Sequence, residues 1–251
     1  MCIEVRNIKI GSGIPKICVP IIGQTSEEIL ASAMEICKLP HDLIEWRVDW
    51  FEGCKDNSAV AEVLMDLRNA IGETPLLFTF RTKAEGGERS MDTDAYINLN
   101  KTAIESGLID LVDVELFTGD ECVSSIIRCA HKNNVYAIVS NHDFEATPDK
   151  EEIINRLTRM AELGADIPKI AVTPADKKDV LTLLSATSKV AETIDKPIIT
   201  MSMKELGVVS RLTGELFGSA ITFGSAESAS APGQIPAEYL EYMLKKMHEF
   251  F

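Results

Sequence analysis

Short apolar runs alternate with amphipathic segments along most of the chain. The apolar runs have the length and composition of β-strands, and they are residues 16–23, 42–50, 75–82, 108–116, 135–140, 167–173, 196–203 and 220–225. Between them, apolar residues recur at helical spacing, as in 26–39, 59–72, 94–107, 150–164 and 237–250. Ser26 and Asp94 are the predicted N-caps, and Gly107 and Gly164 the predicted C-terminal stops.

Eight strand–helix units predict an α/β fold, a (β/α)8 TIM barrel that forms one domain over residues 1–251. The first residues alternate apolar and polar side chains and predict a β-hairpin over 3–10, which we expect to close the bottom of the barrel. A doubly wound open sheet is the alternative. That fold usually has a glycine-rich phosphate turn after its first strand, whereas IIGQTSEE has one glycine and no GxGxxG.

Composition and charge argue against several classes of binding partner and indicate a cellular compartment. The net charge of −14 argues against binding to nucleic acid or to an anionic membrane surface. No apolar stretch approaches the roughly 18 residues of a membrane span, and the first residues lack the apolar region of a signal peptide. The six cysteines are scattered and form no CxxC, which suits a reducing compartment, so we expect a cytoplasmic protein.

Charged residues fall at the strand ends, where the active sites of such barrels are built. Strand alternation places Glu45 and Arg47 on one face, and the later strand ends add another set of polar residues. This set comprises Arg81, Glu85, Asp113, Glu115, His142, Lys169 and Arg211. The arginines could instead form an interior salt-bridge network without a catalytic role, and Asp113 and Glu115 are expected to be their partners.

His142 and Lys169 are the residues that point to chemistry. Alone, His142 before Asp143 fits a turn, and Lys169 fits a surface lysine. Together, an imidazole and an amine in an apolar strand point to carbonyl chemistry through a Schiff base. A metal site fits poorly, because the sequence has no HExxH, and arginines are interleaved among the acidic residues that would bind Mg²⁺.

Six segments carry a resemblance to a known family. They are LIEWRVDW, FTFRTKAEGGE, SNHDF, PKIAVTP, MSMKELGVVSRLTGELFGSAITFG and SAPGQIP. In this order they resemble the type I 3-dehydroquinate dehydratases of the shikimate pathway, and the likeness runs through nearly the whole chain. The resemblance implies a (β/α)8 barrel, a homodimer and a lyase that needs no cofactor or metal. It also implies 3-dehydroquinate as the small-molecule substrate and 3-dehydroshikimate as the product.

The resemblance assigns roles to particular residues. Lys169 would form the imine, His142 would act as general base and acid, and Glu85 would orient His142. The implied substrate-binding residues are Glu45, Trp46, Arg47, Arg81, Met203, Arg211, Phe223, Ser230 and Gln234. The small-residue stretch 224–236 reads either as a flexible loop or as a lid. Pro20 stands where many relatives have a small polar residue, which puts one hydroxyl contact in question.

Two other functions compete with this interpretation. A class I aldolase also uses a barrel lysine, although it usually needs a phosphate cradle that the 224–236 stretch does not resemble. A non-catalytic barrel that binds a shikimate-type acid is the second alternative, and the presence of both His142 and Lys169 argues against it.

Overall fold

The computed structural model describes residues 2–226 and 233–251. A β-hairpin of β1 (Ile3–Val5) and β2 (Ile8–Ile10) precedes the main sheet. The strands of the main sheet are β3 (Lys16–Ile21), β4 (Leu43–Arg47), β5 (Leu76–Thr79), β6 (Leu111–Glu115), β7 (Tyr136–Asp143), β8 (Ile167–Val172), β9 (Ile199–Ser202), β10 (Ile221–Ser225) and the short β11 (Ile235–Pro236). Each of the eight predicted strands is present, and most are shorter than the apolar run that predicted them.

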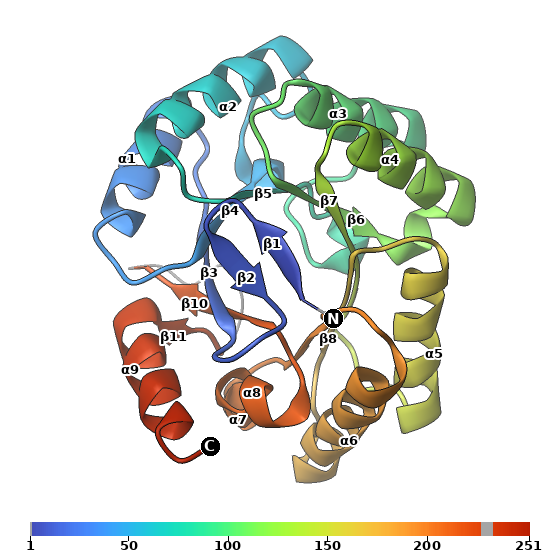
Figure 1. Ribbon diagram of the computed structural model, residues 1–251. Helices are drawn as coiled ribbons and strands as arrows, with labels where there is room; N and C mark the ends of the chain where they lie inside the picture. Colours follow the sequence, from blue (N-terminus) through green and yellow to red (C-terminus); the bar gives the residue numbers. More distant parts are fainter. Residues whose placement is uncertain (1, 227–232) are drawn as a thin grey trace.

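The strands close into a barrel. From β3 to β9 each strand pairs in parallel with the next in sequence, and β10 returns to pair with β3. A bridge between Ile198 and Ser219 joins the remaining neighbours, and the Ala220 amide donates to the Ile198 carbonyl at 2.8 Å. The (β/α)8 prediction is therefore confirmed. Figure 1 shows the helices as an outer ring around the strands, with the hairpin lying across one end of the barrel.

The helices follow the strands in the order expected for this fold. They are α1 (Ser26–Ile36), α2 (Asn57–Ile71), α3 (Thr93–Glu105), α4 (Asp120–Lys132), α5 (Lys150–Glu162), α6 (Lys177–Thr193), α7 (Val208–Leu212), α8 (Gly214–Phe217) and α9 (Ala237–His248), with single 3₁₀ turns η1 (Val48–Trp50), η2 (Lys83–Glu85), η3 (Leu116–Thr118) and η4 (Glu205–Gly207). Within the described residues, none of these helices is both long and apolar enough to cross a membrane.

The helix ends differ slightly from the predicted ones. Thr25, not Ser26, is the N-cap of α1, and Asp92, not Asp94, is the N-cap of α3. In each case the side chain accepts a hydrogen bond from a backbone N–H three residues later, which satisfies a donor that the helix leaves open. Gly107 follows α3 with a positive φ of 70°, a conformation that glycine adopts without steric cost, so its predicted role as a stop is confirmed.

The apolar core has two parts. The larger one lies between the outer face of the barrel strands and the helices. The smaller one lies inside the barrel, and at the N-terminal end of that interior Leu43, Leu77 and Leu111 are fully buried. Val5 and Ile10 of the hairpin belong to this smaller cluster and are themselves buried. The hairpin therefore closes the bottom of the barrel, as predicted, and leaves the opposite end for polar side chains.

Candidate active site

A cavity opens at the C-terminal ends of the strands. Its volume is about 690 Å³ with the open mouth included. Its lining residues come from several strands, from the segments that follow them and from α7, and they are Glu45, Arg47, Arg81, Glu85, Gly86, His142, Phe144, Lys169, Ala171, Met201, Met203, Arg211, Phe223 and Gln234. Ten of the twelve site residues predicted from the sequence are in this set.

Two predicted site residues are not in the lining. Trp46 follows Glu45 on β4, so its side chain points to the opposite face of the strand, where it packs edge-on against Phe78 at 5.7 Å between ring centroids. The structure thus puts Trp46 in the core between the sheet and the helices, outside the lining of the cavity. Ser230 lies outside the described residues, as does much of the predicted lid. Pro20 pairs in register with Glu45 but lines a neighbouring hollow.

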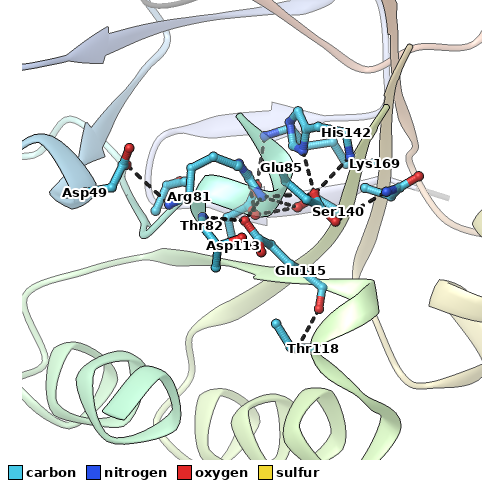
Figure 2. Close-up of polar contacts among 12 residues, drawn as sticks. Asp49, Arg81, Thr82, Glu85, Asp113, Glu115, Thr118, Ser140, His142 and Lys169 are labelled. Atoms are coloured by element: carbon cyan, nitrogen blue, oxygen red, sulfur yellow. Dashed lines mark hydrogen bonds and ion pairs between the residues drawn. The ribbon is translucent and has the colours of Figure 1, made fainter. Parts of the chain in front are cut away.

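Lys169 is buried in the barrel interior and paired with a carboxylate. Its Nζ donates to Asp113 Oδ2 at 2.8 Å, and Nζ also lies 4.7 Å from the centroid of the Phe223 ring (Figure 2 shows the Asp113 contact). Both side chains of the ion pair are almost fully buried, at 3% and 0% exposed. A carboxylate and an aromatic face are the two kinds of neighbour that suit a cationic nitrogen.

Asp113 is the centre of a larger network. Its Oδ1 accepts from the Arg81 guanidinium at 2.7 Å and from the Ser140 hydroxyl at 2.6 Å. Burial alone raises the pKa of Asp113, but the charges of Arg81 and Lys169 outweigh burial and hold this pKa well below its usual range. Arg81 also donates to Glu115 at 2.9 Å. The expectation that Asp113 and Glu115 pair with an arginine is confirmed for Arg81, and Lys169 is a partner of Asp113 that the sequence did not reveal.

His142 lies at the end of β7 against Glu85 of η2. Glu85 Oε2 accepts from the His142 backbone N–H at 2.9 Å and lies 3.1 Å from the ring Nδ1 (Figure 2). Burial, followed by the charges of Arg81 and Lys169, lowers the pKa of His142 well below its usual value, so the ring is neutral at pH 7. Burial raises the pKa of Glu85 to about 7, although Arg81 acts in the opposite direction. A neutral imidazole held by a carboxyl group is therefore ready to accept a proton.

Arg211 brings a positive charge to the opposite wall. It is 1% exposed, and its Nη1 lies 3.5 Å from the Phe223 carbonyl and 3.8 Å from Met201 Sδ. Burial lowers the pKa of Arg211 to about 10, which leaves the guanidinium charged at pH 7. Gln234 and the apolar Met203 lie in the same lining.

The remaining polar residues of the cavity are already held by the protein. Arg47 makes two hydrogen bonds to Asp49, at 2.9 and 2.8 Å, and Glu45 accepts from the Thr79 hydroxyl at 2.8 Å. Among the residues that the structure describes, no group of three or more His, Cys, Asp or Glu residues is arranged to hold a metal ion.

Sequence reasoning missed four lining residues. Alternation from Lys169 and Met203 would have pointed to Ala171 and Met201, because residues two apart on a strand face the same side. Phe144 and Gly86 form a close contact between loops, where a Cβ on Gly86 would lie 2.2 Å from the Phe144 ring. No sequence signal reports that contact.

The fold and the cavity define a (β/α)8-barrel protein with a lysine and a histidine at the C-terminal end of the barrel. Residues 17–250 match the family model of type I 3-dehydroquinase. A 3-dehydroquinate dehydratase from Clostridioides difficile strain 630 is 54% identical over 248 residues, which cover 98% of this chain and 97% of the relative. A 3-dehydroquinate dehydratase from Listeria monocytogenes serotype 4b strain F2365 is 52% identical over 249 residues, or 99% of each chain.

Solved structures agree with the sequence relatives. The crystal structure of type I 3-dehydroquinate dehydratase from Clostridium difficile with covalently modified comenic acid superposes with a TM-score of 0.98 at 53% identity, covering 100% of this chain and 99% of the other. The 3-dehydroquinate dehydratase from Geobacillus kaustophilus gives a TM-score of 0.97 at 39% identity, with 100% and 97% covered. This chain belongs to the type I 3-dehydroquinase family.

Proposed function

We propose that the protein is a lyase that dehydrates 3-dehydroquinate to 3-dehydroshikimate through an imine on Lys169, in the shikimate pathway of aromatic amino acid biosynthesis. The observation that carries the proposal is the convergence of Lys169 and His142 on one cavity, with a carboxylate already on the lysine nitrogen. Family membership supports the substrate, since the relatives are 3-dehydroquinate dehydratases.

In the first half of the reaction, the Lys169 ammonium gives up one proton, and the free amine adds to the C3 carbonyl of the substrate. The released proton and one amine hydrogen leave with the carbonyl oxygen as water, which gives an iminium whose nitrogen keeps one hydrogen. Asp113 is the counter-ion for this cation, because its carboxylate lies 2.8 Å from Nζ and stays ionised. The iminium draws electrons from the neighbouring carbon and thereby acidifies the C2–H bond.

In the second half, His142 moves the proton. With Glu85 ionised, Nδ1–H donates to the carboxylate and Nε2 is left as the base that removes the C2 proton. The electron pair moves into the iminium to form an enamine. The electron pair of the enamine then moves back toward C1 and expels the C1 hydroxyl, which takes the proton from His142 and leaves as water. Addition of one water to the imine then frees the product and the lysine.

The rest of the lining holds the substrate. Arg211, with Gln234, binds the substrate carboxylate, because a guanidinium offers a planar fork of donors and its burial removes competing water. Ring hydroxyls are held by Glu45, Arg47 and Arg81, while Met203 and Phe223 form apolar walls. Ser230 is a further proposed contact that lies outside the described residues.

Trapping with borohydride tests the mechanism. The protein is mixed with 3-dehydroquinate, reduced, digested and mapped by mass spectrometry. We expect water loss from the substrate and a ligand-sized adduct on Lys169. Water loss without an adduct would refute the imine, and carbon–carbon cleavage would favour the aldolase alternative. Tight binding without turnover would favour a non-catalytic barrel. The homodimer and the cytoplasmic location also stay predictions.

A further inference from the structure

Asn141 lies next to the proposed base, on the outer side of the barrel. It precedes His142 on β7, so its side chain points away from the cavity, and it is 3% exposed. Its amide has a partner at each end. Arg156 Nη1 donates to the oxygen Oδ1 at 2.9 Å, and the nitrogen Nδ2 donates to Glu85 Oε1 at 3.3 Å.

Arg156 is itself fixed on several sides. It projects from α5, its Nε donates to Glu152 at 2.7 Å, and its Nη1 lies 3.6 Å from Asp143 Oδ2. Its guanidinium carbon lies 5.4 Å from the centroid of the Phe117 ring. The side chain is 18% exposed, so much of its charge is shielded from solvent. These contacts give the Arg156 guanidinium a defined position, from which it can hold the Asn141 amide in one orientation.

The two contacts determine which way the amide points. Because Arg156 has donors only, it selects Oδ1 of Asn141, and the NH₂ group then faces the carboxylate of Glu85. A rotated amide would place oxygen against carboxylate and NH₂ against guanidinium, which is unfavourable at both ends. Without Arg156, only the weaker contact to Glu85 would choose the orientation.

We infer that Asn141 and Arg156 are positioning residues for His142: Arg156 orients the Asn141 amide, which holds Glu85 as an ionised acceptor against the histidine. This inference rests on the proposed function. Neither residue touches the cavity, so each acts only through Glu85. The chain of contacts runs from α5 through β7 and η2 back to the end of β7.

The charges around Glu85 make its protonation state sensitive to a single hydrogen-bond donor, the Asn141 amide. Arg81, Glu115 and His142 face Glu85, and burial raises the pKa of Glu85 to about 7, so the gain or loss of one donor changes the charge of Glu85 near neutral pH. The hydrogen bond from Asn141 lowers the pKa of Glu85, so losing that bond raises this pKa. A protonated Glu85 would donate to Nδ1 and leave the proton of His142 on Nε2, where a base must be free. The charged groups that face His142 itself are Glu85, Arg81, Lys169, Asp113 and Arg47.

The test compares Arg156→Met with Arg159→Met. Arg159 is on the same helix, is 58% exposed and pairs with Asp120 on the surface, so its replacement removes the same charge without touching Asn141. Turnover of 3-dehydroquinate is measured from pH 5.5 to 9. In parallel, ¹H–¹⁵N NMR follows the ring nitrogens of the ligand-free protein, whose four histidines are assigned with His142→Ala.

For Arg156→Met we expect kcat at pH 7 to fall roughly 10-fold, the size of one hydrogen bond to a charged group. KM should stay unchanged, and the acid limb of kcat/KM should move to higher pH. In the NMR spectra, lowering the pH should convert the Nδ1–H tautomer of His142 into the Nε2–H tautomer. The midpoint of this change should lie at a higher pH in Arg156→Met than in the wild type. Arg159→Met should match the wild type in every measurement.

Two results would overturn the inference. One is an Arg156→Met protein that behaves like Arg159→Met. The other is a loss of turnover with an unchanged pH profile and unchanged His142 spectra, which would indicate a merely structural role. Asn141→Asp keeps a partner for Arg156 while removing the donor to Glu85, so it gives the same readout if Arg156→Met does not fold. Because the NMR titration needs no substrate, it separates this inference from a failure of the proposed function.

Discussion

The interior of the barrel has two layers that share the same strands and differ in their side chains. In the lower layer, Leu43, Leu77 and Leu111 are fully buried and pack against the hairpin. Two residues further along two of these strands, Glu45 and Asp113 face the same interior and are nearly as buried. One layer stabilises the fold by removing apolar surface from water, and the other holds charges that an apolar core would reject.

The difference shows that the free-energy cost of burying charges is confined to the layer that forms the candidate active site. Buried ion pairs add little net stability, because the desolvation of each charge offsets most of the attraction. Asp113 is fully buried and has three partners, Arg81, Ser140 and Lys169, which hold it in a fixed position. Fixed charges stabilise a developing cation without reorganising, which is the main electrostatic contribution of an enzyme site. The lower layer supplies the stability that lets the upper layer remain charged.

Among replacements in the two layers, that of Lys169 should cause the largest loss of turnover. Lys169→Met keeps the length and the burial of the side chain but removes the amine. We expect turnover to fall by more than the roughly 10²–10⁴-fold that positioned proton transfer contributes, because no imine can form. Substrate binding should survive, since the other contacts remain. Steady-state kinetics and isothermal titration calorimetry measure both, and turnover near that of the wild type would refute the role of Lys169.

Replacement of His142 should have the next largest effect. His142→Ala removes the base, so kcat should fall at least roughly 100-fold. The imine does not need His142 for its own stability, because Asp113 is the counter-ion. Borohydride should therefore still trap an adduct on Lys169. If no adduct forms, His142 must also assist the addition of the amine, and the division of roles proposed for the two residues would be wrong.

Much of the upper layer could be predicted from the sequence, because strand period and strand order are local properties. Alternation put Glu45 and Arg47 on one face, and the barrel topology put Lys169 at the correct end. The same rule puts Trp46 on the opposite face, although the family resemblance implied it as a substrate-binding residue.

Contacts between strands were harder to predict. The pairing of Lys169 with Asp113 depends on the register across β7, which sets the height of each side chain in the barrel. The contact from Arg156 to Asn141 depends on how α5 packs against the sheet. No local pattern reports either quantity, because both are set by tertiary packing.

Replacement of Arg211 should alter binding more than chemistry. Arg211→Ala removes a buried guanidinium that we propose as the partner of the substrate carboxylate. A hydrogen bond to a charged group contributes about 1.5–3 kcal/mol, so KM should rise roughly 10- to 100-fold. The kcat value should change much less, because Arg211 does not contact the reacting atoms. Initial-rate kinetics over a wide substrate range measure this split, and an unchanged KM would move the carboxylate site elsewhere.

Replacement of Leu111 should have the smallest effect on turnover, although it lies on the same strand as Asp113. Leu111→Ala leaves a cavity in the lower layer, and such changes cost about 2–5 kcal/mol of folding free energy. Denaturant unfolding should show this loss, while kcat per folded molecule stays close to that of the wild type. A matched drop in kcat would mean that the lower layer also sets the position of Asp113. In that case the two layers would act as one unit, and the charged site would depend on the packing beneath it as much as on its own hydrogen bonds.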